Sequence, residues 1–312
     1  MSLHVVLGKG PVGTALTERL VADGHEVRVL SRSGGTSGGA VEHRALDAAH
    51  APALLAAARG AEVLYNCANP AYHRWATDWP PVAHALLTAA EATGAVLVTM
   101  SNLYGYGPVD GPISEDLPLA STGTKGRVRA TMWEQALARH EAGALRVTEA
   151  RASDFVGRGV LDGHLGKGVV PRVLAGKAAY VLVDADQPHS WTSVSDVGAA
   201  LAVLGTDERA WGRAWHVPTD AAASVREAVH GLCAAAGVEP VAVRTVPHLL
   251  LRATGLVVPL LRELEEMRHS FTAPYVLDSS AFSSVFGIEA TPLEQTWAET
   301  VAWWRGRALA AA

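Results

Sequence analysis

The sequence predicts an α/β fold, in which a doubly wound parallel sheet is followed by a smaller C-terminal lobe. Three observations lead to this prediction. Short apolar segments alternate with helix-periodic segments through the first half of the chain, the apolar segments are nearly continuous, and the alternation stops near Gly157. Continuous apolar strands are typical of burial on both faces, which occurs when helices cover both sides of a parallel sheet.

The expected elements follow one another in a regular order. Apolar residues three and four apart, such as Val12, Leu16 and Leu20, indicate helices, whereas the strands are short apolar runs. The expected strands are Leu3–Leu7, Glu26–Leu30, Val41–Arg44, Glu62–Asn66, Ala95–Met100 and Leu145–Arg151. The expected helices are Val12–Ala22, Pro52–Arg59, Pro81–Ala92 and Arg127–His140.

The second half of the chain predicts a smaller lobe. Residues Gly157 to Gly168 include five glycines and are expected to form a long loop. The main domain is expected to be residues 1–156, with residues 190–218 rejoining its sheet through the segment Trp191–His216. Residues 157–189 and 219–312 would form the substrate lobe and the closing helix. The lobe is expected to contain Val169–Gly176, Val225–Ala236 and His248–Arg268.

Composition excludes several classes of protein. The 312 residues are 49% hydrophobic and 18% charged, which is enough for a large core and argues against disorder. A net charge of −5 without long charge runs argues against nucleic-acid and membrane-surface partners. Two cysteines, Cys67 and Cys233, predict no disulfide framework, and no leader is recognised, so we expect a cytoplasmic protein. The thirteen histidines form no metal-ligand spacing, so no metal is expected.

The first expected strand runs directly into a glycine-rich turn. Gly8 permits a tight turn, Gly10 lets backbone approach a pyrophosphate, and Gly13 lets the next helix lie close to the sheet. Strand, glycine turn and helix in this order are the dinucleotide fingerprint of a Rossmann-type sheet. The helix that begins at Val12, directly after Pro11, would offer free N–H groups and a partial positive charge to the phosphates.

The residues after the second strand predict NADP(H) as the cofactor. Ser31 and Arg32 stand where an NAD-selective site places a carboxylate, and Lys9 adds a cation within the glycine turn. Asp47 is a candidate acceptor for the adenine amino group, or else a helix N-cap. The small segment containing Ala68 and Asn69 would let backbone run beside the cofactor ribose.

The chain resembles the extended short-chain dehydrogenase/reductase family, in its sugar-nucleotide epimerase and dehydratase branch. The resemblance covers almost the whole chain and implies a nicotinamide cofactor, with Phe155 in a segment that lines the nicotinamide. It also implies a homodimer, in which the helices Pro81–Ala92 and Arg127–His140 pair across a two-fold axis. The motifs that carry it are Gly8–Gly13, Leu103–Gly105, Ser114–Pro118, Arg151–Gly159, Val194–Val197, Thr291–Glu294 and Trp303–Trp304.

One departure from the family concerns its chemistry. The family exchanges a proton through a tyrosine four residues before a lysine, and the lysine lowers the tyrosine pKa. The corresponding window, residues 122–134, contains no tyrosine. One alignment places Gly126 and Ala130 at the two catalytic positions, and a shift by one places Lys125 and Arg129 there. The chain therefore resembles atypical members that lack the usual catalytic residues.

Other residues are candidates for the missing proton donor. Tyr104 follows the carboxyl end of the fifth strand, where ligands bind in open α/β sheets, and Ser101 and Asn102 precede it. Tyr104 is the expected donor, although packing of a half-buried aromatic ring is an equal alternative. Lys125 would contact the ribose or favour a phenolate, or else be a solvated lysine at a helix start.

An aromatic segment after the fourth strand is a candidate substrate surface. It contains His73, Trp75 and Trp79, and is expected to be a loop at the pocket mouth. Packing of this loop against the next helix is the alternative. His164, in the glycine-rich loop, is a further candidate for substrate binding.

The sequence leaves three functions open. The first is an NADP(H)-dependent oxidoreductase of the atypical short-chain kind, which transfers a hydride to or from a small carbonyl or imine substrate. The second is a nucleotide-sugar epimerase or dehydratase, which the missing tyrosine disfavours. The third is a regulatory protein that binds NADP(H) without turnover.

Overall fold

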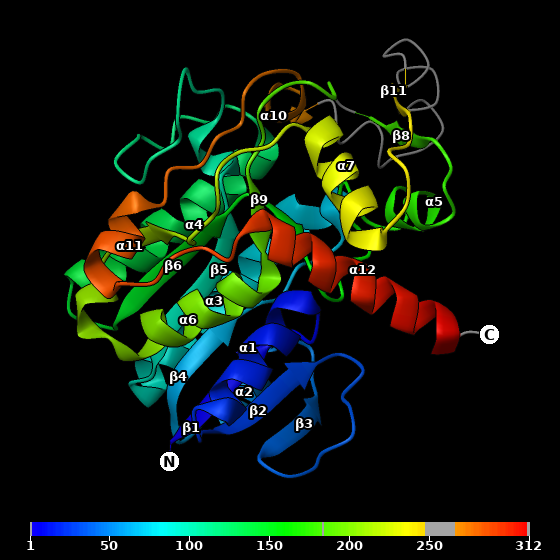
Figure 1. Ribbon diagram of the computed structural model, residues 1–312. Coiled ribbons are helices and arrows are strands. Elements are labelled where there is room, and N and C mark those ends of the chain that lie inside the picture. The colour runs from blue at the N-terminus through cyan, green and yellow to red at the C-terminus, as the bar shows by residue number, and fades with distance from the viewer. Residues whose placement is uncertain (1, 183, 247–265, 311–312) are drawn as a thin grey trace. The chain divides into compact units, whose positions relative to one another are not determined.

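The chain forms two compact units, which we describe separately. A computed structural model describes residues 2–182, 184–246 and 266–310. The sheet unit consists of Met1–Gly107, Leu117–Arg151 and Val197–Val217, and the second unit consists of Pro108–Asp116, Ala152–Asp196 and Pro218–Ala312. The division falls after Arg151, at the end of β6 (Val147–Ala152; Figure 1), whereas the main domain was expected to extend to residue 156; the next strand, β7 (Asp154–Val156), is not part of the main sheet.

The sheet unit is built on seven strands in the order β10-β6-β5-β4-β1-β2-β3. Parallel pairing joins β1 to β2 and β4, β2 to β3, β4 to β5, and β6 to β10. The order reverses beside β1, which is the topological switch point of a Rossmann-type sheet, so the predicted fold class is confirmed. The strands are β1 (Leu3–Leu7), β2 (Glu26–Ser31), β3 (Val41–Ala45), β4 (Ala61–Asn66), β5 (Val96–Asn102), β6 (Val147–Ala152) and β10 (Ala214–His216).

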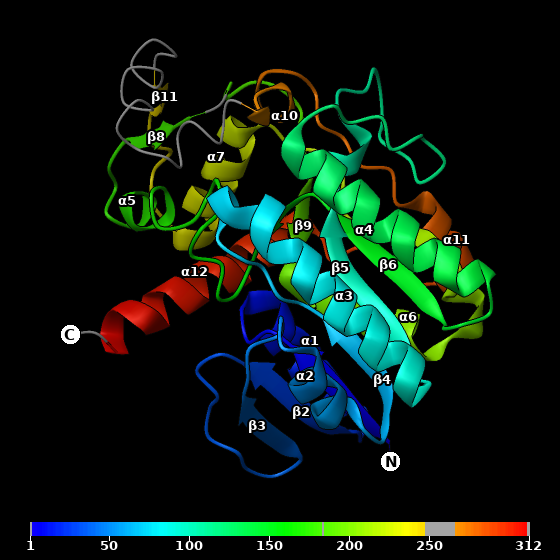
Figure 2. The same cartoon turned by 180° about the vertical axis from the view of Figure 1, so that it is seen from behind.

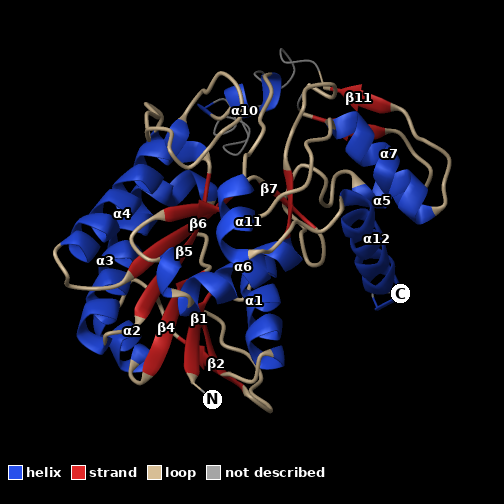
Figure 3. Ribbon diagram, turned by 60° about the vertical axis from the view of Figure 1, so that its left-hand side comes forward, coloured by secondary structure: helices blue, strands red, loops and turns tan. Residues whose placement is uncertain are grey.

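Helices cover both faces of this sheet (Figures 2 and 3). On one face α1 packs against α6, where a Cβ on Gly198 would lie 2.8 Å from the backbone of Ala15. On the other face α2, α3 and α4 bury side chains such as Leu54, Leu86 and Trp133 against the strands. The helices are α1 (Pro11–Ala22), α2 (Ala51–Ala58), α3 (Trp75–Thr93), α4 (Thr124–Glu141) and α6 (Val194–Thr206), with short 3₁₀ turns η1 (Tyr72–Arg74), η2 (Tyr104–Tyr106) and η3 (Glu208–Ala210).

Helix α3 begins earlier than the sequence predicts. The segment expected to be a loop up to Pro80 is η1 followed by the first turns of α3, and Pro80 and Pro81 lie inside the helix. Trp75 and Trp79 lie one turn apart and are only 2% and 0% exposed, so their burial stabilises a helix that two prolines would otherwise weaken.

The second unit has its own core and two small parallel sheets. Strand β7 (Asp154–Val156) pairs with β9 (Trp191–Ser193), and β8 (Ala179–Val181) pairs with β11 (Val243–Thr245). Of the segment expected to rejoin the main sheet, β9 therefore pairs elsewhere and only β10 enters it. The core includes Trp191, Leu232 and Trp297. The helices are α5 (Val170–Leu174), α7 (Val225–Ala236), α10 (His269–Thr272), α11 (Ser280–Phe286) and α12 (Leu293–Ala310).

Local signals explain the best-defined helix of this unit. Helix α7 starts at a capping box, in which the Ser224 hydroxyl accepts from the Glu227 backbone and the Glu227 carboxylate accepts from Ser224. It ends at Gly237, whose φ of 63° is the left-handed conformation that closes helices. The predicted segment His248–Arg268 lies, as far as residue 265, outside the described residues.

Candidate functional site

The glycine turn between β1 and α1 is fixed by close backbone contacts. Gly8 has φ of 109°, and a Cβ there would lie 2.5 Å from the carbonyl oxygen of Cys67, which follows β4. A Cβ on Gly13 would overlap the carbonyl oxygen of Gly8. Neither position accepts a side chain, because both hold the start of α1 against the ends of two strands.

Gly10 differs from its two neighbours in the turn. It is the N-cap of α1, and a Cβ placed on it would meet nothing within 4 Å. The first N–H groups of a helix have no carbonyl four residues earlier in the helix, and in α1 these include the amides of Val12 and Gly13. Pro11 occupies the first helical position, where a missing N–H costs nothing. The turn thus presents open space beside a helix N-terminus, a setting that suits a pyrophosphate.

The loop after β2 contacts the glycine turn through Lys9. Lys9 donates from Nζ to the carbonyl of Gly34 at 2.6 Å, and the Ser31 hydroxyl donates to the same oxygen at 3.2 Å. Arg32 is exposed beside them, and its charge contributes to the lowered pKa of Asp78, of which the hydrogen bond from Arg74 is the main cause. A guanidinium, an ammonium and a hydroxyl therefore follow β2 and the glycine turn.

The remaining cofactor candidates lie in three places. Asp47 is exposed and accepts from the Ala49 backbone at 3.0 Å, in a turn before α2, whose N-cap is His50. After β4, the buried Asn66 side chain accepts from the Ala68 backbone at 3.3 Å, and Asn69 is exposed. Phe155 lies on β7 of the second unit and is half-buried.

The buried face of α4 carries two cations one helical turn apart. Lys125 is 2% exposed, and its Nζ lies 4.7 Å from the centre of the Tyr72 ring. The Arg129 guanidinium lies between two indoles, 4.6 Å from Trp75 and 4.4 Å from Trp79. Burial lowers the pKa of Arg129 to about 10, against the opposing effects of Glu149 and Tyr104.

The aromatic segment was expected to form either a substrate surface or a packing contact, and its two tryptophans form a packing contact. Trp75 and Trp79 are core residues, and their ring faces contact the Arg129 guanidinium. A substrate therefore has no room on these ring faces. His73 is exposed on η1. The sequence signal for this arrangement is the four-residue spacing of the two tryptophans, which matches one helical turn.

Three polar candidates end β5 and begin η2. Ser101 is buried at the end of β5, and Asn102 accepts from the Tyr104 backbone at 3.1 Å. The half-buried Tyr104 ring packs against Trp75 with 6.0 Å between ring centres, and edge-on against Tyr72 at 6.4 Å. Tyr104 therefore belongs to the same aromatic cluster as the two cations of α4.

Sequence reasoning missed a buried charge network on β6. Glu149 accepts from Arg151 at 2.7 Å, and both side chains are 4% exposed. Arg151 also donates to the Tyr106 hydroxyl at 2.7 Å, which lies 2.8 Å from Nε2 of His216. Burial raises the pKa of Glu149 despite the charge of Arg151. Alternate residues of a strand share one face, so the spacing of Glu149 and Arg151 was the available signal.

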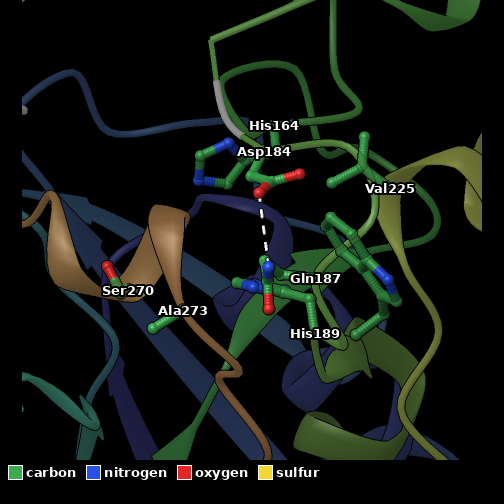
Figure 4. Close-up of a pocket in the computed structure, with 8 residues that line it drawn as sticks. His164, Asp184, Gln187, His189, Val225, Ser270 and Ala273 are labelled. Atoms are coloured by element: carbon green, nitrogen blue, oxygen red, sulfur yellow. Dashed lines mark hydrogen bonds between the residues drawn. The ribbon is translucent and has the colours of Figure 1, made fainter. Parts of the chain in front are cut away.

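The second unit contains a carboxylate between two imidazoles. Asp154 lies 2.7 Å from Nε2 of His189 and 3.7 Å from Nε2 of His164. Burial raises the pKa of Asp154, but His164 and His189 outweigh it and lower that pKa to about 2. His164 and His189 line a cavity of about 10 Å³ together with Asp184, Gln187, Trp191, Val225, Ser270 and Ala273 (Figure 4).

Neither a metal site nor a membrane-spanning helix is found among the described residues. No group of three or more histidine, cysteine, aspartate or glutamate side chains is arranged there to hold a metal ion. No helix in the described ranges has both the length and the apolar composition that crossing a bilayer requires.

Comparisons with known proteins give the family. The fold matches solved structures of MoeE5 in complex with UDP-glucose and NAD (TM-score 0.79, 22% identity, 99% of this chain and 100% of that chain). It also matches dTDP-glucose 4,6-dehydratase from Bacillus anthracis in complex with NAD (TM-score 0.79, 17% identity, 98% and 97%). UDP-glucose 4-epimerase from Thermotoga maritima with UDP-glucose matches as well (TM-score 0.79, 17% identity, 99% and 100%). No curated protein matches the sequence. Because residues 5–217 match its sequence pattern, the chain belongs to the NAD dependent epimerase/dehydratase family.

Proposed function

We propose that this chain is an NADP(H)-dependent oxidoreductase of the atypical short-chain type, which acts on a small carbonyl or imine compound. The observation that carries the proposal is the glycine turn, where Gly10 leaves open space at the N-terminus of α1 while Gly8 and Gly13 permit no side chain. Such a turn suits the pyrophosphate of a dinucleotide.

The preference for NADP(H) rests on the residues around β2. Ser31 ends this strand and Arg32 follows it, where an NAD-selective site places a carboxylate, and Lys9 reaches the same loop. A guanidinium and hydroxyls attract a 2′-phosphate, whereas a carboxylate would repel it. The solved structures of MoeE5 and of the dehydratase hold NAD, so the proposal separates this chain from those proteins at a single loop.

The residues proposed to hold the cofactor come from four segments. The glycine turn and the start of α1 would take the pyrophosphate, and the loop after β2 would take the 2′-phosphate. Asp47 would accept from the adenine amino group, and the segment after β4 would lie beside the ribose. The cofactor residues are Gly8, Lys9, Gly10, Pro11, Val12, Gly13, Ser31, Arg32, Asp47, Ala68 and Asn69, with Phe155 in the segment that the family resemblance assigns to the nicotinamide.

The bound cofactor supplies a hydride to the carbonyl carbon, and a protein group must then protonate the oxygen. We assign this role to the Tyr104 hydroxyl, with Ser101 and Asn102 as hydrogen-bond partners of the same oxygen. The buried cations Lys125 and Arg129 beside its aromatic cluster favour a phenolate. His73 and His164 are retained as candidates for contact with the substrate.

A nucleotide-sugar epimerase or dehydratase is the second candidate, because two of the matched structures are a dTDP-glucose 4,6-dehydratase and a UDP-glucose 4-epimerase. Helix α4 contains no tyrosine, although that chemistry begins by oxidising a sugar hydroxyl and needs a strong base. A protein that binds NADP(H) without turnover is the third candidate, and it rests on the same missing tyrosine.

Calorimetry followed by turnover assays tests these alternatives. We expect NADPH to bind at least ~10-fold more tightly than NADH, and Arg32→Asp to reverse the preference, because the exposed Arg32 is replaceable without a change in the core. With a panel of carbonyl and imine compounds we expect NADPH oxidation, and a loss of about 100-fold in Tyr104→Phe. Binding without oxidation would support the regulatory protein, and UDP-glucose consumption would support the epimerase.

The homodimer implied by the family resemblance is also a proposal. Helices α3 and α4 lie side by side on one face of the sheet (Figure 2), as pairing across a two-fold axis requires. Analytical ultracentrifugation at micromolar concentration distinguishes a dimer from a monomer.

A further inference from the structure

Two residues of the second unit, Asp154 and His189, have no role in the proposed oxidoreductase, although they lie beside His164, which is a candidate for contact with its substrate. His189 is 8% exposed and lies 2.7 Å from Asp154, on the strand β7. A carboxylate only accepts hydrogen bonds, so the hydrogen of neutral His189 is on Nε2. The other ring nitrogen, Nδ1, then keeps a lone pair, and no hydrogen bond within the described residues occupies it.

The position of His189 is fixed by its surroundings. The ring stacks on Tyr275 at 5.4 Å between centres and lies 4.6 Å from Trp191. The backbone on both sides is also held, since Ser190 donates to the Tyr275 carbonyl at 2.9 Å and Tyr275 donates to Pro188 at 2.9 Å. An imidazole with a fixed ring and a carboxylate partner is prepared to accept a proton without reorganisation.

The cavity beside His189 is the size of a water molecule. Its volume of about 10 Å³ is close to what one water needs, and its polar lining offers several hydrogen-bond partners. Gln187 donates to Asp184 at 3.3 Å across this cavity (Figure 4). The charged and titratable groups around His189 are Asp154, His164, Asp184 and Tyr275. Two carboxylates here disfavour an anionic ligand.

We propose that Asp154 and His189 form a general-base dyad that removes a proton from a water molecule bound at this cavity. The proton moves from the water oxygen to Nδ1 of His189, and the resulting imidazolium is stabilised by the ionised Asp154. Asp154 stays a carboxylate throughout. The oxygen that has lost the proton adds to the carbonyl carbon of an ester, and the bond from that carbon to the leaving oxygen breaks. His189 then gives up its proton to the leaving oxygen or, where that oxygen leaves as a stable phenolate, to solvent.

Hydrolysis of p-nitrophenyl acetate by the whole chain tests this activity without the cofactor. Water adds to the ester carbonyl, p-nitrophenolate leaves, and acetate forms, so water is the only co-reactant. We expect His189→Gln to lose about 10-fold or more of the protein-catalysed rate constant. His84→Gln, which removes an exposed histidine from α3, should keep the wild-type rate.

The pH profile separates a general base from a structural histidine. We expect the wild-type rate to rise through the titration of one imidazole, and Asp154→Asn to move that midpoint to lower pH, because the charge that stabilises the imidazolium is gone. Asp154→Asn keeps the size of the side chain, so it carries the test if His189→Gln does not fold. A wild-type rate in His189→Gln, or an unmoved midpoint in Asp154→Asn, would overturn the proposal. Neither result depends on NADPH binding.

Discussion

Replacing Gly10 and Gly13 by alanine, one at a time, separates cofactor binding from folding within one turn. Each change adds a single methyl group. At Gly10 the new Cβ meets nothing within 4 Å, and the φ of −73° suits alanine. At Gly13 it overlaps the carbonyl oxygen of Gly8. We therefore expect opposite patterns, with affinity lost in the first variant and stability lost in the second.

The magnitudes follow from these surroundings. At the N-cap, glycine to alanine costs up to about 1 kcal/mol, and a reduction in unfolded-state entropy of about 0.4–1 kcal/mol offsets it. The melting temperature of Gly10→Ala should thus stay within about 4 °C of wild type. A methyl group that keeps a pyrophosphate from the α1 amides removes charge-assisted hydrogen bonds of about 1.5–3 kcal/mol each, so NADPH affinity should fall about 100-fold.

Calorimetry with NADPH and thermal unfolding of the same samples measure both quantities. Gly13→Ala should lose about 1–3 kcal/mol of stability through overpacking and melt several degrees lower. If Gly10→Ala binds NADPH as tightly as wild type, the open space at Gly10 is not the phosphate site. If it melts as low as Gly13→Ala, the steric reasoning is wrong.

Three other predictions concern buried groups. Glu149→Gln should destabilise the chain by about 3–5 kcal/mol in chemical denaturation, because it leaves Arg151 buried without its counter-ion, and a loss below about 1 kcal/mol would contradict the buried pair. The pKa of His4 is lowered to about 4, chiefly by burial, so unfolding free energy should fall by up to about 3 kcal/mol as pH drops from 6.5 towards 4, and a flat profile would contradict this. Cys67 is half-buried, and burial raises its pKa to about 12, so in a Cys233→Ser background Ellman's reagent at pH 8 should label this thiol much more slowly in the folded chain than after unfolding, and equal labelling rates would contradict the raised pKa.

Periodicity alone predicted most of the sheet unit. The expected strand Leu3–Leu7 has the observed bounds of β1, and the expected Glu26–Leu30 is one residue shorter than β2. Strand β1 is buried from His4 to Leu7, and β2 is buried at Val27, Val29 and Leu30, so both strands carry a clear apolar signal. The start of α3 was missed because two prolines and several aromatic residues suggested a loop, whereas the contacts of Trp75 and Trp79 with Arg129 come from a helix distant in sequence.

In the candidate sites, too, local features could be predicted from the sequence and contacts between distant segments could not. The strand–turn–helix geometry at Gly8 and Gly13 follows from local sterics, which a motif records directly. The contact of Asp154 with His189 joins residues 35 positions apart through the pairing of β7 with β9. The periodicity of the sequence does not predict this contact, because the contact depends on which short strands pair in three dimensions.

The interleaving of the two units limits how this protein can be dissected. The chain crosses from one unit to the other after Gly107, Asp116, Arg151, Asp196 and Val217. No single truncation therefore yields either unit intact. A fragment ending at Arg151 would lack β10 and expose the backbone amides of β6. Such an exposed strand edge can pair with the same edge of another molecule and cause aggregation. Separate expression of the sheet unit would need new connections between its segments, from Gly107 to Leu117 and from Arg151 to Val197.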